Sequence, residues 1–295
     1  MTERRAALAL LSAAGAGILV GAAMVATRAV IEQSDPASLA LMRYVLGCLC
    51  LLPPLLMLRR VRVARRDLLP ICLLGIAQFG VLIVLLNWGL QYMGSARGSV
   101  IFSVMPLLTM LLGAAFGSER LSFAAGAGVV VSMLGVALSL ADKLIAEQPV
   151  AGHWWGEVAV FLSALTGAVC SVLYRPYVAR YPALQVGFIA MLASVAVLVL
   201  PAAQAGFFAD WPRLDAVGWG CVGFIGLASG LGYFFWLWAL EHTTPTRVTV
   251  FMALSPPTAT VLGVVLLDER ITPIFLAGLA CVTAGLWLAL RRPAE

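Results

Sequence analysis

The sequence has very little charge. Of its 295 residues only 11% are Asp, Glu, Lys or Arg, and 62% are hydrophobic, whereas a soluble domain typically has about 25% charged residues. The charges cluster in short breaks between apolar runs of roughly 20 residues, the length at which an α-helix crosses the hydrocarbon core of a bilayer. This pattern excludes an ordinary soluble domain and predicts a polytopic α-helical membrane protein.

The sequence also lacks the groups that support catalysis, metal binding or ATP hydrolysis. Its two histidines, His153 and His242, lie at the ends of apolar runs, and none of the 14 acidic residues lies in the middle of one. The six cysteines have no partner at metal-ligand spacing, and no glycine loop of the Walker type is present. We therefore expect no enzyme, no cofactor, no metal site and no buried carboxylate for proton coupling.

The apolar runs predict ten membrane spans. The first run continues from Ala7 to Ile31, which is longer than the h-region of a signal peptide, so we interpret it as a retained helix. The predicted spans are Ala7–Ile31, Ala37–Leu58, Leu68–Leu90, Ser95–Phe116, Leu121–Leu140, Trp154–Leu173, Leu184–Phe207, Val217–Leu240, Val248–Leu267 and Ile271–Leu290.

The basic residues indicate the orientation of these spans. If both termini lie in the cytoplasm, thirteen of the nineteen Lys and Arg residues lie on the cytoplasmic side and five outside, as the positive-inside rule requires. The remaining one, Arg43, lies within the second span, where we expect a structural residue that snorkels or pairs near the outer interface. Because the basic residues sit at helix ends, they predict topology in a plasma (bacterial inner) membrane and no nucleic-acid partner.

The second half of the chain repeats the first at an offset of 150 residues. The aligned pairs include Trp88 and Trp238, Arg97 and Arg247, Pro106 and Pro256, Gly113 and Gly263, Glu119 and Glu269, and Gly135 and Gly285. Each repeat contains five spans, so the second enters the membrane from the opposite side. We therefore predict two inverted repeats, residues 1–145 and 146–295, forming one membrane domain around a central cavity, an architecture common among secondary transporters.

Three short motifs make a family resemblance specific. They are Leu41-Met42-Arg43-Tyr44, Gly117-Ser118-Glu119-Arg120-Leu121 and Leu267-Asp268-Glu269-Arg270-Ile271. With the repeat, they make the chain resemble the EamA-type ten-helix exporters of the drug/metabolite transporter superfamily, most of all the bacterial branch that exports aromatic and neutral amino acids. The resemblance implies a cavity lined by the first, third, fourth, sixth, eighth and ninth helices, with the fifth and tenth at the periphery.

Polar side chains within the spans are few and are therefore candidates for the substrate cavity. On the helices that the resemblance assigns to the cavity, together with two neighbouring apolar residues, they are Gln78, Phe79, Leu82, Asn87, Ser99, Ser103, Ser163, Thr166, Ser229, Thr249 and Ser255. The alternative is that such hydroxyls bond their own backbone or join neighbouring helices.

Prolines interrupt the fourth and ninth spans at equivalent positions. Pro106, Pro256 and Pro257 each remove a backbone donor and so predict either a symmetry-related pair of hinges or passive kinks. Glu119 and Glu269 precede the fifth and tenth helices, where we expect them to cap these helices.

These features favour a secondary transporter that exports small neutral or zwitterionic metabolites, above all amino acids, by alternating access and facilitated diffusion. The alternatives are a broad exporter of metabolites or aromatic drugs, possibly coupled to protons, and, from a different class, a membrane-embedded enzyme. No obligate protein partner is evident beyond the lipid bilayer and the small-molecule substrate.

The orientation can be checked by labelling cysteines in a background that lacks the six native ones. A cysteine introduced near Glu147 should react with a membrane-impermeant maleimide in intact cells, because the loop after the fifth span is predicted to lie outside. A cysteine at Arg62 is the control and should react only after permeabilisation. The reverse pattern would invert the topology.

Overall fold

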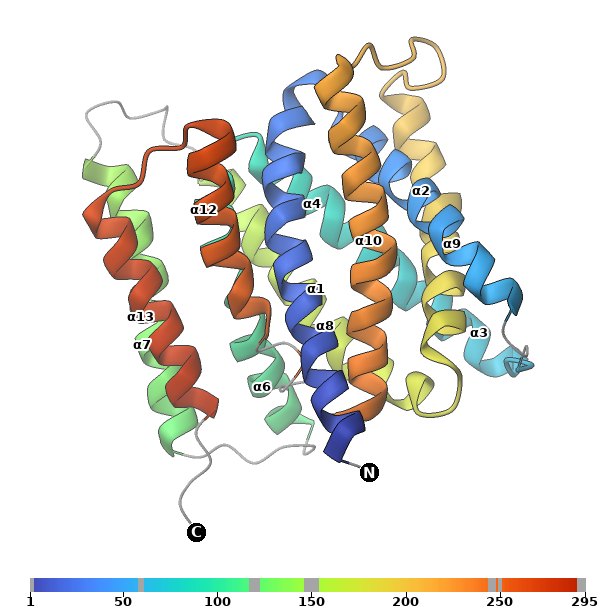
Figure 1. Ribbon diagram of the computed structural model, residues 1–295, viewed down its shortest axis with the longest axis horizontal. Helices are drawn as coiled ribbons and strands as arrows, with labels where there is room; N and C mark the ends of the chain where they lie inside the picture. The colour runs from blue at the N-terminus through green and yellow to red at the C-terminus, as the bar shows by residue number, and fades with distance from the viewer. Residues whose placement is uncertain are drawn as a thin grey trace.

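We analysed a computed structural model of the chain, which describes residues 3–57, 61–116, 123–145, 154–243, 248 and 251–290. All regular structure in these residues is helical (Figure 1). The elements are α1 (Glu3–Val30), η1 (Ile31–Gln33), α2 (Pro36–Met57), α3 (Arg65–Gly75), η2 (Ile76–Val81), α4 (Leu82–Leu90), α5 (Ser95–Phe102), α6 (Met105–Ala115), α7 (Phe123–Ile145), α8 (Trp155–Val178), α9 (Ala183–Gln204), α10 (Ala216–His242), η3 (Phe251–Leu254), α12 (Ser255–Leu267) and α13 (Pro273–Leu290).

These elements form the ten predicted spans. Seven stretches are long and apolar enough to cross a membrane, and three shorter apolar helices, at 126–138, 251–267 and 273–288, complete the set within the described residues. The ten-helix, all-α prediction is therefore confirmed.

The helices run antiparallel to their neighbours in sequence, and both chain ends lie at the same end of the bundle (Figure 1). Consequently each helix of the first half runs opposite to its counterpart in the second, α1 against α8 and α7 against α13. The α7–α13 pair packs together at one edge, as the resemblance implied. At their contact Gly135 and Gly285, 150 residues apart, lie against the backbone of the partner helix at Gly278 and Gly128.

The fourth and ninth spans are broken rather than kinked at their prolines. Instead of a continuous helix, α5 ends at Phe102 and α6 begins at Met105, with Pro106 in its first turn. Likewise η3 precedes α12, in whose first turn Pro256 lies. A proline at the start of a helix forfeits no hydrogen bond, because the first-turn N–H groups have no intrahelical partner.

Glu269 caps a helix of the other repeat instead of the helix that follows it. Its carboxylate accepts hydrogen bonds from Ser95 N at 2.7 Å, Ser95 Oγ at 2.7 Å and Ala96 N at 3.1 Å, at the N-terminus of α5. The cause is the left-handed turn at Asp268, with φ of 52°, which directs the chain back towards α12. Its counterpart Glu119 lies outside the described residues.

Close backbone contact joins α1 to the second repeat. A Cβ atom added at Gly21 would meet the carbonyl oxygen of Ser255 at 2.5 Å and Thr258 Cβ at 2.9 Å. Only glycine permits this approach, which places α1 beside α12 and the central cavity.

Gly21→Ala should therefore lower the thermal unfolding midpoint of the detergent-solubilised protein, because overpacking typically costs about 1–3 kcal/mol. Gly223→Ala is the matched control: nothing lies within 4 Å of its Cβ position, and alanine is the better helix former. Equal midpoints for the two variants would show that this contact is not tight.

Candidate functional site

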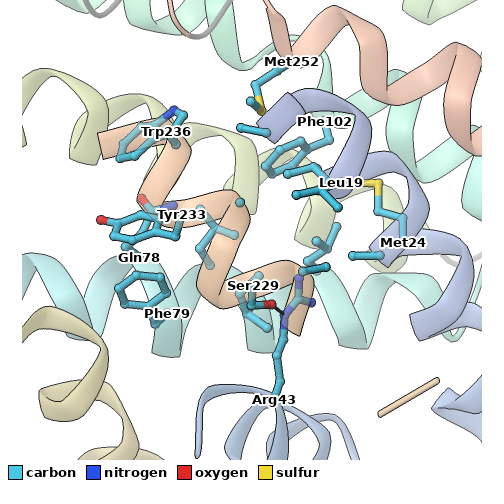
Figure 2. Close-up of a pocket in the computed structure, with 18 of the residues that line it drawn as sticks. Leu19, Met24, Arg43, Gln78, Phe79, Phe102, Ser229, Tyr233, Trp236 and Met252 are labelled. Atoms are coloured by element: carbon cyan, nitrogen blue, oxygen red, sulfur yellow. Dashed lines mark hydrogen bonds between the residues drawn. The ribbon is translucent and has the colours of Figure 1, made fainter. Parts of the chain in front are cut away.

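A cavity of about 90 Å³ lies between the two repeats. Its walls come from α1, α2, η2, α4, α10 and the broken ends of the fourth and ninth spans (Figure 2). The α1 wall is apolar, formed by Ala16, Leu19, Val20, Ala23 and Met24.

Much of the cavity lining follows the 150-residue sequence repeat. Six pairs of lining residues are 150 positions apart in the sequence: Gln78 and Ala228, Phe79 and Ser229, Leu82 and Gly232, Ile83 and Tyr233, Leu86 and Trp236, and Phe102 and Met252. The last pair lies at the two helix breaks, four residues before Pro106 and Pro256. The cavity is thus built by equivalent positions of two inverted halves, where substrate sites of such proteins lie.

The third span contains a π-helix where it begins to line the cavity. The six residues Ile76–Val81 have this rare geometry, which often marks functional sites. Gln78 and Phe79 project from it, and Leu82, Ile83 and Leu86 continue the same face along α4.

Aromatic rings form one side of the cavity (Figure 2). Phe79 packs edge-on between Tyr44, with ring centroids 4.8 Å apart, and Tyr233, at 4.3 Å. Tyr233 in turn stacks on Trp236 at 5.3 Å. Offset and edge-to-face arrangements of this kind are the favourable ones, so the wall is rigid and apolar.

Few polar groups reach the cavity. Arg43 enters it from α2, 7% exposed, and its Nε donates a hydrogen bond to Ser229 Oγ, which itself donates to the carbonyl oxygen of Ile225 at 2.6 Å (Figure 2). Gln78 Oε1 and Tyr233 Oη have no hydrogen-bond partner among the described residues. The lining contains neither a carboxylate nor a histidine in the described part of the chain.

Four of the residues predicted from the sequence meet at this cavity: Gln78, Phe79, Leu82 and Ser229. Three others instead bond their own helix. Ser99 Oγ donates to Ala96 O at 2.7 Å, Ser103 Oγ to Val100 O at 2.6 Å, and Thr166 Oγ1 to Leu162 O at 2.8 Å.

The remaining predicted residues join neighbouring helices or lie beside the cavity. Asn87 Nδ2 donates to Pro36 O at 3.1 Å, Ser163 Oγ to Leu82 O at 2.9 Å, and Ser255 Oγ contacts Met24 Sδ at 3.8 Å. Pro106, Pro256 and Pro257 do not line the cavity. Pro106 directly follows the lining residue Met105, and Pro256 lies four residues after the lining residue Met252. Thr249 lies outside the described residues.

The family resemblance predicted that the sixth span would line the cavity and the second would not. In the structure the sixth span, α8, does not reach the cavity, and the second span, α2, does. The reason is that Met105 and Leu82, both lining residues, lie 2.9 and 3.1 Å from the Cβ position of Gly167 and so separate α8 from the cavity. Sixteen of the twenty lining residues were absent from the predicted set, among them Arg43, Tyr44, Tyr233 and Trp236. The charge inside the second span was the signal for Arg43.

Two inverted five-helix halves around a small cavity define a secondary transporter. The chain belongs to the EamA-like transporter family, whose sequence model matches residues 7–141 and 154–291, within the drug/metabolite transporter superfamily. It is a multi-pass integral membrane protein and not an enzyme.

Several relatives support this assignment. An uncharacterized transporter of Archaeoglobus fulgidus is 25% identical over 275 residues, 92% of this chain and 95% of the relative. A protein of Streptantibioticus cattleyicolor described as a "probable terminal-alkyne amino-acid exporter" is 31% identical over 229 residues, 77% of this chain and 74% of the relative. A crystal structure with 21% sequence identity superposes with a TM-score of 0.73 over 96% of both chains, which shows the same fold.

Filling the cavity should stop transport. Ala228→Phe should reduce flux about tenfold or more, a loss of about 1.4 kcal/mol or more, because Ala228 lines the cavity and the added phenyl ring would occupy the space that a substrate needs. Leu227→Phe, on the next residue, is the control, since Leu227 is 48% exposed and faces away from the core. Flux would be measured in proteoliposomes with equal amounts of folded protein, and similar flux through both variants would contradict the assignment of this cavity.

Proposed function

We propose that this transporter exports small neutral or zwitterionic metabolites, above all amino acids, across the plasma membrane by alternating access. The observation that supports it is the cavity at the repeat interface, with apolar and aromatic walls and few polar groups. Such walls accommodate side chains of mixed type, while a small number of polar groups fix orientation. The relative from Streptantibioticus cattleyicolor, described as an amino-acid exporter, points to the same class of substrate.

The size of the cavity favours metabolites over drugs. Its volume of about 90 Å³ lies below the roughly 300–1,000 Å³ of pockets that hold drug-sized ligands. This small volume favours a small metabolite over a drug-sized molecule, and the choice among small metabolites rests on the chemistry of the lining.

Alternating access follows from the symmetry of the two halves. Equivalent positions line both sides of the cavity, so an exchange of conformation between the halves would exchange the side on which it opens. The breaks before Pro106 and Pro256 divide their spans at the level of the cavity, and we assign to them the hinge role. Glu269, which binds the N-terminus of α5 from the end of α12, would keep the two broken spans together as they move.

The acids in the described residues are held away from the cavity, which favours facilitated diffusion. Asp67, in the first turn of α3, accepts hydrogen bonds from Tyr181 Oη at 2.7 Å and Arg180 Nη1 at 3.2 Å. Glu157 is buried in the first turn of α8, the helix that Met105 and Leu82 separate from the cavity. Neither lines the cavity.

The function is tested by flux into liposomes that contain the purified protein, with a panel of radiolabelled amino acids. Uptake of apolar amino acids above the level of protein-free liposomes, saturable and blocked by Ala228→Phe, is the expected result. Absence of flux for the whole panel would reject amino acids as the substrate class.

Coupling is tested in the same liposomes with substrate at equal concentration on both sides and an imposed pH gradient. Facilitated diffusion predicts no net accumulation of leucine, whose charge is constant near neutral pH. Accumulation that disappears when the pH difference is collapsed would show proton coupling, and Glu157→Gln would then be the first variant to examine.

A further inference from the structure

Arg43 is a cation in the protein interior without an anionic partner. Its side chain is buried, and no carboxylate lies within ion-pair distance of it in the described part of the chain. Arginines that do form ion pairs lie at or near helix ends, as Arg28 does with Glu32 at 2.7 Å. A charge within a membrane span is costly, and such residues generally face a cavity and serve function.

The hydrogen bonds of Arg43 leave its terminal nitrogens available. Nε is held by Ser229 Oγ, whose own proton is committed to Ile225 O. Nη1 and Nη2 have no hydrogen-bond acceptor among the described residues, and the guanidinium borders the cavity (Figure 2). Ser229 therefore fixes the plane of the guanidinium while its outer edge remains free. A fixed guanidinium edge matches the two oxygens of a carboxylate.

We propose that Arg43 binds the carboxylate of the transported substrate. The inference rests on the proposed function, because it names the group by which an amino acid would be recognised. The pair would neutralise the guanidinium in the membrane interior, so the substrate supplies the anion that the protein lacks there.

The rest of the cavity suits the remainder of an apolar amino acid. Phe79, Tyr233 and Trp236 line the cavity and give it an aromatic wall for its side chain. Gln78 Oε1 is an unpartnered acceptor, able to take a hydrogen bond from an ammonium group, but the lining provides no negative charge for it. Recognition therefore depends on the carboxylate, and the ammonium group contributes little.

The greater importance of the carboxylate over the ammonium group is tested with three ligands of matched shape. L-leucine carries both groups, 4-methyl-2-oxopentanoate keeps only the carboxylate, and L-leucinamide keeps the ammonium and replaces the carboxylate with a neutral amide. Each is measured for inhibition of radiolabelled leucine flux and for thermal stabilisation of the purified protein. The oxo acid should compete and stabilise, and leucinamide should do so about 10- to 100-fold more weakly, the value of a charge-assisted hydrogen-bonded pair.

Variants test whether the preference for a carboxylate depends on Arg43. Arg43→Gln should lose this preference, so that leucine and leucinamide bind with nearly equal affinity. Arg43→Lys, which keeps the charge but not the planar edge, should retain part of it. Arg28→Gln is the matched control and should keep the wild-type ratio.

The outcomes separate the two proposals. Flux of leucine with equal competition by leucinamide would overturn the role of Arg43 and leave the proposed function intact. A loss of flux in Arg43→Gln with an unchanged ratio of ligand affinities would show a purely structural arginine and also overturn it. Neither flux nor stabilisation by any of the three ligands in the wild type would reject both.

Discussion

A polar group inside a bilayer must find its partner within the protein, because no water is available there. This constraint accounts for most of the local structure. Hydroxyls within the spans return to carbonyls of their own helix, as Ser99, Ser103 and Thr166 do. Prolines lie in first turns, where a missing donor costs little. The open N-terminus of α5 receives the carboxylate of Glu269 from the opposite repeat.

The same constraint makes the exceptions informative. Two of the buried polar atoms that have no hydrogen-bond partner among the described residues, Gln78 Oε1 and Tyr233 Oη, belong to residues that line the cavity. Others, such as Ser194 Oγ and Thr260 Oγ1, lie elsewhere. The cavity in turn lies where the two inverted halves meet, and six pairs of its lining residues repeat at 150 positions. The inverted repeat therefore accounts for both the fold and the site. Equivalent faces of the two repeats are turned towards each other and enclose a cavity that neither repeat could form alone.

The sequence was sufficient for the fold, because the bilayer imposes the length of each span and a shift of 150 residues reveals the repeat. It was less informative about the site. Ser99, Ser103 and Ser229 all donate to a carbonyl of their own helix, but only Ser229 lines the cavity. The sequence does not distinguish them. The depth and direction of Arg43 depend on how α2 packs against α10, and the partner of Glu269 depends on the turn at Asp268. Such contacts between repeats leave no local pattern.

The lining of the cavity is asymmetric in its charge, because the guanidinium of Arg43 has no charged counterpart in the second repeat. The counterpart of α2 is α9, Ala183–Gln204, which contains no charged residue. Among the residues that the structure describes, therefore, only the first repeat brings a guanidinium to the cavity. Two facing arginines would repel each other in a medium that screens charge poorly. A single one gives the cavity a charged end and an aromatic side, the same polarity that an amino acid has between its carboxylate and an apolar side chain. Under the proposed function, the symmetric part of the lining would serve alternating access, which requires equivalent halves, and the asymmetric part would select the substrate.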